Sequence, residues 1–295
     1  MSTISASQLG HVYRSGEWAL RDVSFDLPAG SVTALVGANA AGKTTLLEVL
    51  AGVRTPAAGD YSAGSRIRLV AHDKPLYLRM TVADHLEFGR RANTRWNDEL
   101  AREWLRDFNV PLRSRCGALS AGQRAQVALA LALGAESSTL LLDEVLANMD
   151  PVVRGDVVSA LLGINADSGV TIVLSTHSPA ELAGAVDHLL VLASGRLVAA
   201  GQVDELLNSH RRYVGPRADR TVAGQLPVSG EVIWSDPRSR QTTALVRHPR
   251  PIATVPPGWS SNPVTLDELV HDYLRAAHHR TDQRAPIQLV DTEAS

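Results

Sequence analysis

The 295-residue sequence contains a single cysteine, few aromatic residues (4%) and no long apolar run. Because Cys116 stands alone, the sequence excludes an internal disulfide and a cysteine-based zinc site, and this cysteine usage is typical of a reducing compartment. No window approaches the roughly eighteen apolar residues of a membrane-spanning helix, and residues 1–6 show no signal-peptide pattern. We therefore expect a cytoplasmic protein.

The sequence also has no excess of charge of one sign. Its 29 basic and 31 acidic residues give a formal net charge of −2, so no overall field attracts the protein to nucleic acid or anionic lipid. We expect no nucleic-acid partner, and any association with a membrane must occur through another protein. A hydrophobic fraction of 44% is that of an ordinary globular chain, long enough for one large α/β domain and a smaller appendage.

Residues 37–45 match the phosphate-binding pattern G-x-x-x-x-G-K-[ST]. Gly37 and Gly42 let the backbone turn tightly enough to point consecutive N–H groups at anionic oxygens. Lys43 can then reach the β- and γ-phosphates, and the Thr44 hydroxyl can ligate Mg²⁺. We predict that this loop binds a nucleoside triphosphate through Gly37, Ala38, Asn39, Ala40, Ala41, Gly42, Lys43, Thr44 and Thr45.

The sequence around this loop has the required order of strand, loop and helix. Residues 31–36 form a short apolar run rich in β-branched residues, which favours a buried parallel strand. Apolar residues follow the loop at helical spacing, at Leu46, Leu47, Val49, Leu50 and Val53. The alternative is a glycine-rich turn without a ligand.

A second predicted strand, residues 138–142, ends in Asp143 and Glu144. Parallel α/β sheets place their chemistry at such strand ends. We expect Asp143 to hold Mg²⁺ and Glu144 to orient or deprotonate the attacking water. Alternatively, the two carboxylates only begin the next helix, whose N-terminus favours negative charge.

Ser120 precedes an apolar helix that includes residues 125–133. Ser120 and Gln123 have the spacing of a capping box, which predicts a helix N-terminus at this point. The free N–H groups of a helix N-terminus can bind an anion, and that anion need not belong to the same chain.

Together, residues 37–45, 119–123, 140–144, 148–150 and 175–177 closely resemble, in order and spacing, the motifs of ATP-binding cassette (ABC) transporter nucleotide-binding domains. The resemblance extends over about residues 4–210. It implies an α/β P-loop NTPase cassette with a mixed sheet and an inserted helical subdomain at about residues 74–135. It also implies ATP and Mg²⁺ as cofactors.

The resemblance assigns roles to further residues. It implies that Tyr13 stacks on adenine, although Tyr13 could equally be a half-buried strand residue. It implies that His177 binds the γ-phosphate and acts in catalysis together with Lys43 and Glu144. Residues that would meet ATP held by a second cassette are Ser120, Gly122, Gln123 and, across the same interface, Asp150.

His72 departs from the family pattern, because ABC transporters normally carry a glutamine at this position that contacts Mg²⁺ and water. A neutral imidazole can accept a hydrogen bond or ligate a metal, whereas a protonated one cannot. We expect His72 to contact the nucleotide and Mg²⁺, and ATPase activity to fall below about pH 6.5, the reference value for histidine. The alternative is an exposed loop histidine with no such role.

The resemblance also implies a mechanism and partners. Two cassettes, identical or paired as a heterodimer, close head to tail around two ATP molecules and drive an integral membrane permease subunit. The protein would lie at the inner face of the membrane, and its layout resembles bacterial ATPases paired with small exporters. The alternatives are a soluble ABC ATPase of translation or repair, or a nucleotide-sensing subunit with weak ATPase.

We divide the chain into an ATP-binding domain at 1–212, a small α+β extension at 213–276 and a flexible tail at 277–295. In the inserted subdomain, residues 81–88 and 96–108 predict amphipathic helices, and the subdomain should hold the groove for the permease. In the extension we predict strands at 230–234 and 242–246, then a helix capped by Thr265 and Glu268. The extension is a regulatory or dimer-stabilising module, or packs on its own cassette; we favour the second interpretation.

Overall fold

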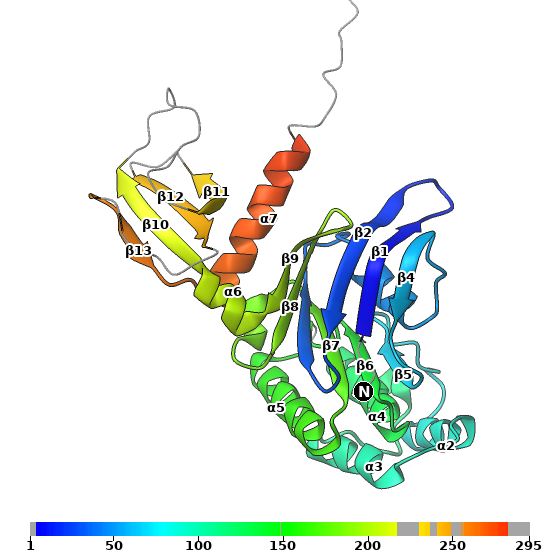
Figure 1. The fold of residues 1–295 in the computed structure, drawn as a ribbon. Helices are drawn as coiled ribbons and strands as arrows, with labels where there is room; N and C mark the ends of the chain where they lie inside the picture. Colours follow the sequence, from blue (N-terminus) through cyan, green and yellow to red (C-terminus); the bar gives the residue numbers. More distant parts are fainter. Residues whose placement is uncertain are drawn as a thin grey trace, which may run out of the picture. The chain divides into compact units, whose positions relative to one another are not determined.

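The computed structural model describes residues 4–147, 149–216, 230–236, 241–248, 255 and 257–282. The chain divides into two compact units, the first ending at Leu206 and the second beginning at Leu207. The division falls inside α6 (Val203–Ser209), before the boundary that the sequence predicted after residue 212. Figure 1 shows the course of the chain by colour.

The centre of the first unit is a six-stranded sheet with the strand order β5-β6-β7-β3-β8-β9. Its strands are parallel except for β9, which pairs antiparallel with β8, and this confirms the predicted mixed sheet. Three of them are buried at every position, as their apolar sequences require. The bounds are β3 Val32–Val36, β5 Ile67–Val70, β6 Thr139–Asp143, β7 Thr171–Thr176, β8 His188–Ala193 and β9 Arg196–Gln202.

A second, antiparallel sheet in this unit has the order β2-β1-β4 and was not predicted from the sequence. It comprises β1 (Ile4–Val12), β2 (Trp18–Leu27) and β4 (Ala58–Ser62). Side chains of β1 and β2 share one buried cluster with the helix α1 (Lys43–Leu50) and with central strands. This shared core places the β1–β2 hairpin close to the loop that precedes α1.

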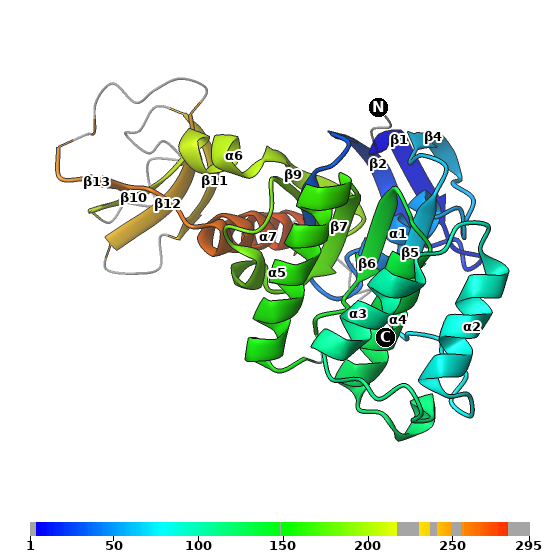
Figure 2. The ribbon, with the colours of Figure 1, turned by 90° about the horizontal axis from the view of Figure 1, so that it is seen from below.

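The predicted helical subdomain contains α2 (Val82–Ala92), α3 (Asp98–Asp107), the short 3₁₀ helix η1 (Cys116–Ala118) and α4 (Ala121–Gly134). Figure 2 shows α2, α3 and α4 together, and α4 packs against the other two. Trp96 packs between α2 and α4. A Cβ atom added at Gly89 of α2 or at Gly134 of α4 would lie 2.7 Å from its ring. Helix α5 (Pro151–Ser168) follows β6, and η2 (Pro179–Leu182) follows β7.

The second unit has a four-stranded antiparallel sheet with the order β11-β12-β10-β13 and one long helix, α7 (Leu266–Asp282). The predicted strands correspond to β11 (Glu231–Asp236) and β12 (Gln241–Arg247), whereas β10 (His210–Pro216) and β13 (Ser260–Asn262) were missed. The Glu268 carboxylate accepts the N–H of Thr265, as predicted for the cap. These elements confirm the small α+β extension. Because α7 continues to Asp282, regular structure extends beyond residue 277, where we placed the flexible tail; residues 283–295 lie outside the described residues.

Candidate active site

The loop at residues 37–42 connects the buried strand β3 to the N-terminus of α1. Both of its glycines are required by close packing. A Cβ atom at Gly37 would lie 2.4 Å from the carbonyl oxygen of Leu192, and one at Gly42 would lie 2.7 Å from that of Ala19. Gly42 also has φ 106°, which L side chains rarely adopt. The loop therefore packs against β2 and β8. Ala41 is buried as well, whereas Ala38, Asn39 and Ala40 are exposed.

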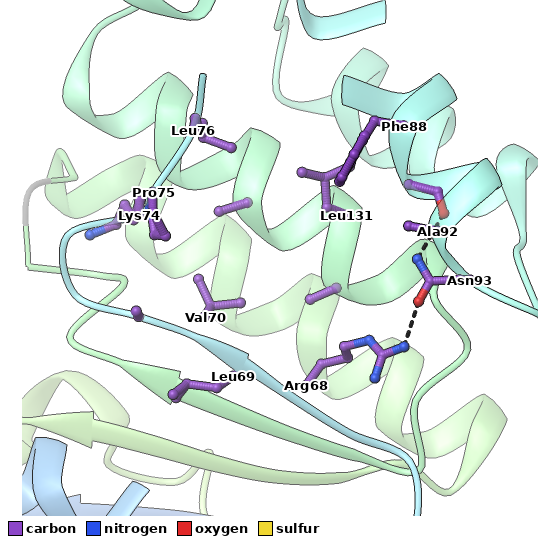
Figure 3. A pocket seen from close by; sticks show the side chains of 14 residues that line it. Arg68, Leu69, Val70, Lys74, Pro75, Leu76, Phe88, Ala92, Asn93 and Leu131 are labelled. Atoms are coloured by element: carbon purple, nitrogen blue, oxygen red, sulfur yellow. Dashed lines mark hydrogen bonds between the residues drawn. The ribbon is translucent and has the colours of Figure 1, made fainter. Parts of the chain in front are cut away.

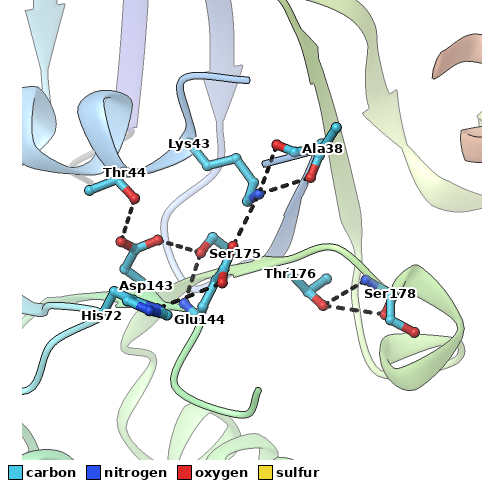
Figure 4. A network of polar contacts seen from close by, with 10 residues as sticks. Ala38, Lys43, Thr44, His72, Asp143, Glu144, Ser175, Thr176 and Ser178 are labelled. Carbon is cyan, nitrogen blue, oxygen red and sulfur yellow. Dashed lines mark hydrogen bonds and ion pairs between the residues drawn. The ribbon is translucent and has the colours of Figure 1, made fainter. Parts of the chain in front are cut away.

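Lys43 begins α1 and directs its ammonium group back over the loop (Figure 4). Its Nζ donates to the carbonyl oxygens of Gly37 at 2.8 Å and Ala38 at 3.2 Å, and lies 3.1 Å from Glu144 Oε1. Lys43 is only 5% exposed. A cation held in this position faces the space in which the loop N–H groups would receive anionic oxygens.

Asp143 ends β6, and its side chain is hydrogen-bonded to one side chain from α1 and one from β7. Its carboxylate accepts hydrogen bonds from Thr44 Oγ1 at 2.7 Å and from Ser175 Oγ at 2.6 Å. The Ser175 hydroxyl in turn accepts the backbone N–H of Glu144 at 2.9 Å. Sequence analysis gave Ser175 no role; its signal is a polar residue near the end of the apolar strand β7.

Thr44 and Asp143 fit a magnesium ion. Mg²⁺ prefers hard oxygen ligands and is usually bound by one or two protein oxygens together with substrate phosphates. The hydrogen bond between the Thr44 hydroxyl and the Asp143 carboxylate places two such donors side by side at the start of the phosphate loop's helix. The donor set therefore suits a magnesium ion that also binds substrate phosphates.

Glu144 lies between two basic side chains. Besides the contact with Lys43, its Oε2 lies 3.6 Å from Nδ1 of His72, whose side chain is 54% exposed. Glu144 also has φ 47°, which costs a residue with a Cβ atom on the order of 1–2 kcal/mol. The structure thus places His72 beside the predicted general base.

Tyr13 follows β1, in the turn that leads to β2. Its hydroxyl lies 2.6 Å from Oγ1 of Thr45, the residue after Thr44. The residue is 38% exposed, and the guanidinium carbon of Arg54 lies 5.5 Å from the centroid of its ring. The aromatic ring is therefore anchored to α1 and retains an accessible surface close to the phosphate loop.

The remaining predicted residues lie at helix or strand ends. Ser120 is the exposed N-cap of α4, where its hydroxyl accepts the N–H of Gln123 and the Gln123 side chain accepts the N–H of Ser120. Asp150 caps α5 by accepting the N–H of Val152, and His177 is exposed immediately after β7. Gly122 lies in the first turn of α4. The capping box predicted at Ser120 is confirmed.

A hollow of about 270 Å³ lies beside β5, α2 and α4 (Figure 3). Its wall is mostly apolar and includes Val70, Leu76, Leu131 and the 55% exposed Phe88. Lys74 also lines the hollow and donates from Nζ to the carbonyl oxygen of His72 at 2.9 Å. Burial lowers the pKa of Lys74 from its ordinary value, against the opposing charges of Asp143, Asp73 and Glu144.

The parallel sheet, the phosphate loop and the strand-end carboxylates define a P-loop NTPase. A family model described as ABC transporter matches residues 20–147. The molybdenum import ATP-binding protein ModC of Mycobacterium tuberculosis is 34% identical over 266 residues, covering 80% of this chain and 70% of that protein. The thiamine import ATP-binding protein ThiQ of Brucella abortus is 30% identical, covering 72% and 92% respectively. The chain belongs to the ABC transporter ATP-binding proteins.

Solved structures have the same fold. The ATP-binding subunit of an ABC transporter superposes with a TM-score of 0.63 at 25% identity, covering 70% of this chain and 92% of that one. A dimeric bacterial ABC transporter cassette gives a TM-score of 0.62 at 19% identity, covering 68% and 98%. The predicted fold class is therefore confirmed.

Family membership makes this chain an ATP-binding and ATP-hydrolysing subunit of an ABC transporter. The expected likeness to exporter ATPases is wrong, because the relatives named above are import proteins. The error arose because the ATP-binding motifs and the apolar helix α4 do not by themselves identify the direction of transport. The match to ModC covers 80% of the chain, which is more than the first unit, Met1–Leu206, contains. The match therefore includes part of the second unit.

Proposed function

We propose that this chain hydrolyses Mg²⁺-ATP as one of two paired cassettes that drive an import-type permease. The observation that carries the proposal is the connected set of Lys43, Thr44, Asp143, Glu144 and Ser175 beneath the phosphate loop (Figure 4). It contains a cation for the phosphates, oxygen ligands for a metal and a carboxylate for water.

Phosphoryl transfer to water depends on positioning and on charge stabilisation. The loop N–H groups and Lys43 bind the β- and γ-phosphates. Thr44 and Asp143 would hold Mg²⁺, which neutralises charge on the phosphate oxygens. Glu144 accepts a proton from the attacking water or orients it, and the exposed His177 contributes a hydrogen bond to the γ-phosphate.

The partner cassette completes the site in this proposal. The N-terminus of α4 is exposed at Ser120, so its helix dipole and the N–H groups that the capping box does not engage are available to an anion outside the chain. Gly122 and Gln123 lie in the same turn, and Asp150 begins α5. We assign these four residues to the ATP bound by the second copy or by a paired cassette.

We assign the hollow beside β5, α2 and α4 to a short segment of the permease. Its apolar wall suits the apolar face of a helix, and Phe88 and Tyr77 leave 55% and 63% of their surface exposed at or near its rim. None of the helices in the described parts of the chain has the length and apolar character needed to cross a lipid bilayer. We therefore propose attachment to the inner face of the membrane through the permease.

The decisive experiment compares the parent chain with Glu144→Gln. We expect the parent to hydrolyse ATP and the variant to bind ATP, form a dimer and lose steady-state hydrolysis. Equal rates would remove Glu144 from its assigned role. The matched control is Glu136→Gln, which alters an exposed carboxylate paired with Arg95 and should leave the rate unchanged.

A further inference from the structure

Tyr13 contacts three side chains, from β1, from α1 and from the loop after α1. Its hydroxyl lies 2.6 Å from Thr45 Oγ1, its ring and that of His11 meet edge to face with 5.6 Å between centroids, and the Arg54 guanidinium lies over one face. The backbone fixes it too, because Tyr13 N–H donates to the Glu17 carbonyl at 2.8 Å. One face of the ring is therefore directed toward Arg54, and Tyr13 is still 38% exposed, so it retains surface for a ligand.

Arg54 is itself anchored to α1. Its guanidinium Nε donates to Glu48, and its backbone N–H donates to the Glu48 carbonyl oxygen at 3.2 Å. The loop after α1 can turn back in this way because Gly52 has φ 73°. Helix α1 thus carries Lys43 and Thr44 at its N-terminus and Glu48, the anchor of Arg54, further along the same helix.

We propose that Arg54 is a positioning residue for the nucleobase: by stacking on Tyr13 it fixes the ring in the orientation that receives the base of the bound nucleotide. The inference rests on the proposed function, because it requires the triphosphate to lie in the loop at residues 37–45. A guanidinium on an aromatic face is a favourable cation–π contact. A ring that is already ordered loses less side-chain entropy when a base stacks on it.

Ordering one side chain costs about 0.5–1.5 kcal/mol, which is about two- to twelvefold in a dissociation constant. We therefore expect Arg54→Met to weaken binding of a non-hydrolysable ATP analogue about three- to tenfold. Inorganic tripolyphosphate has no base, so its dissociation constant should change less than about twofold. In steady-state assays, KM for ATP should rise while kcat stays the same, and Arg54→Lys should restore part of the affinity.

Two controls separate positioning from charge and packing. Arg54→Met leaves the Glu48 carboxylate unpaired, so the double variant Arg54→Met, Glu48→Gln should show the same base-specific loss. Arg21→Met removes a comparable guanidinium, 5.6 Å from the Trp18 ring, and should leave both dissociation constants unchanged.

The measurement is calorimetric titration of the full chain with each ligand. A loss for the analogue alone supports the inference, whereas an equal loss for tripolyphosphate, no loss for either, or the same effect from Arg21→Met overturns it. If the parent chain binds neither ligand, the proposed function fails and this inference with it. If the parent binds both and Arg54→Met behaves like the parent, only this inference fails.

Discussion

The Lys43 ammonium lies 3.1 Å from the Glu144 carboxylate, so in this structure the residue assigned to phosphate is paired with the residue assigned to water. Lys43 also donates to the carbonyl oxygens of Gly37 and Ala38. Its three donors are thereby directed at protein oxygens. Entry of a γ-phosphate would compete with Glu144 for Lys43, and the carboxylate would then be released toward water.

Glu144→Gln removes the charge that pairs with Lys43 and the proton acceptor for water. General base catalysis contributes about 10²–10⁴-fold, so we expect kcat to fall by about that factor. Binding of ATP should persist or strengthen, because a neutral amide competes less with the γ-phosphate for Lys43. Single-turnover hydrolysis and equilibrium binding check the two effects, and weaker ATP binding by the variant would contradict the competition.

His72 lies beside the same carboxylate, with its Nδ1 3.6 Å from Glu144 Oε2. Because this contact helps to orient the group assigned to the attacking water, we expect His72→Ala to lower kcat by up to about 10²-fold and to leave the affinity for ATP little changed. Steady-state rates and equilibrium binding check the two effects, and an unchanged kcat would refute this role.

Ala40 has φ 61° in the phosphate loop, where a Cβ atom costs on the order of 1 kcal/mol relative to glycine. We expect Ala40→Gly to raise the free energy of unfolding by about 0.5–1 kcal/mol, measured by urea denaturation. Ala41 is the control, because it is 5% exposed and has no positive φ, so Ala41→Gly should destabilise the chain. Destabilisation by Ala40→Gly would show that the strain is not relieved.

Trp96 fills the space between α2 and α4 at Gly134. A methyl group at Gly134 would lie 2.7 Å from the ring, and overpacking of this kind costs about 1–3 kcal/mol. We expect Gly134→Ala to lower the unfolding free energy by that amount and to change Trp fluorescence. Gly155 in α5 has no atom within 4 Å of such a methyl group, so Gly155→Ala should stabilise the chain by about 0.4–1 kcal/mol.

The sequence predicted the parts of the site that local chemistry dictates. Three features each have a local sequence pattern with one physical cause. They are the glycines of the phosphate loop, the apolar strand before Asp143 and the capping box at Ser120. Ser175 was not assigned a role, because a serine near the end of a strand has no meaning until β6 and β7 pair and bring it to Asp143.

The missed strands depend on distant partners. β4 reads Ala-Gly-Asp-Tyr-Ser with little alternation and is a strand because it pairs with β1, some fifty residues earlier in the chain. β10 carries Arg212, which is partly buried because Glu268 and Asp272 of α7 pair with it. Ion pairs of this kind let a strand include charged residues, although the polar sequence by itself favours a loop.

The Ser175 hydroxyl also links the positions of Asp143 and Glu144. It donates a hydrogen bond to the Asp143 side chain and accepts one from the backbone N–H of Glu144, so a displacement of the carboxylate assigned to the metal would also displace the peptide that carries Glu144. Ser175→Ala would uncouple them, and metal affinity and turnover would then respond separately to changes at either residue.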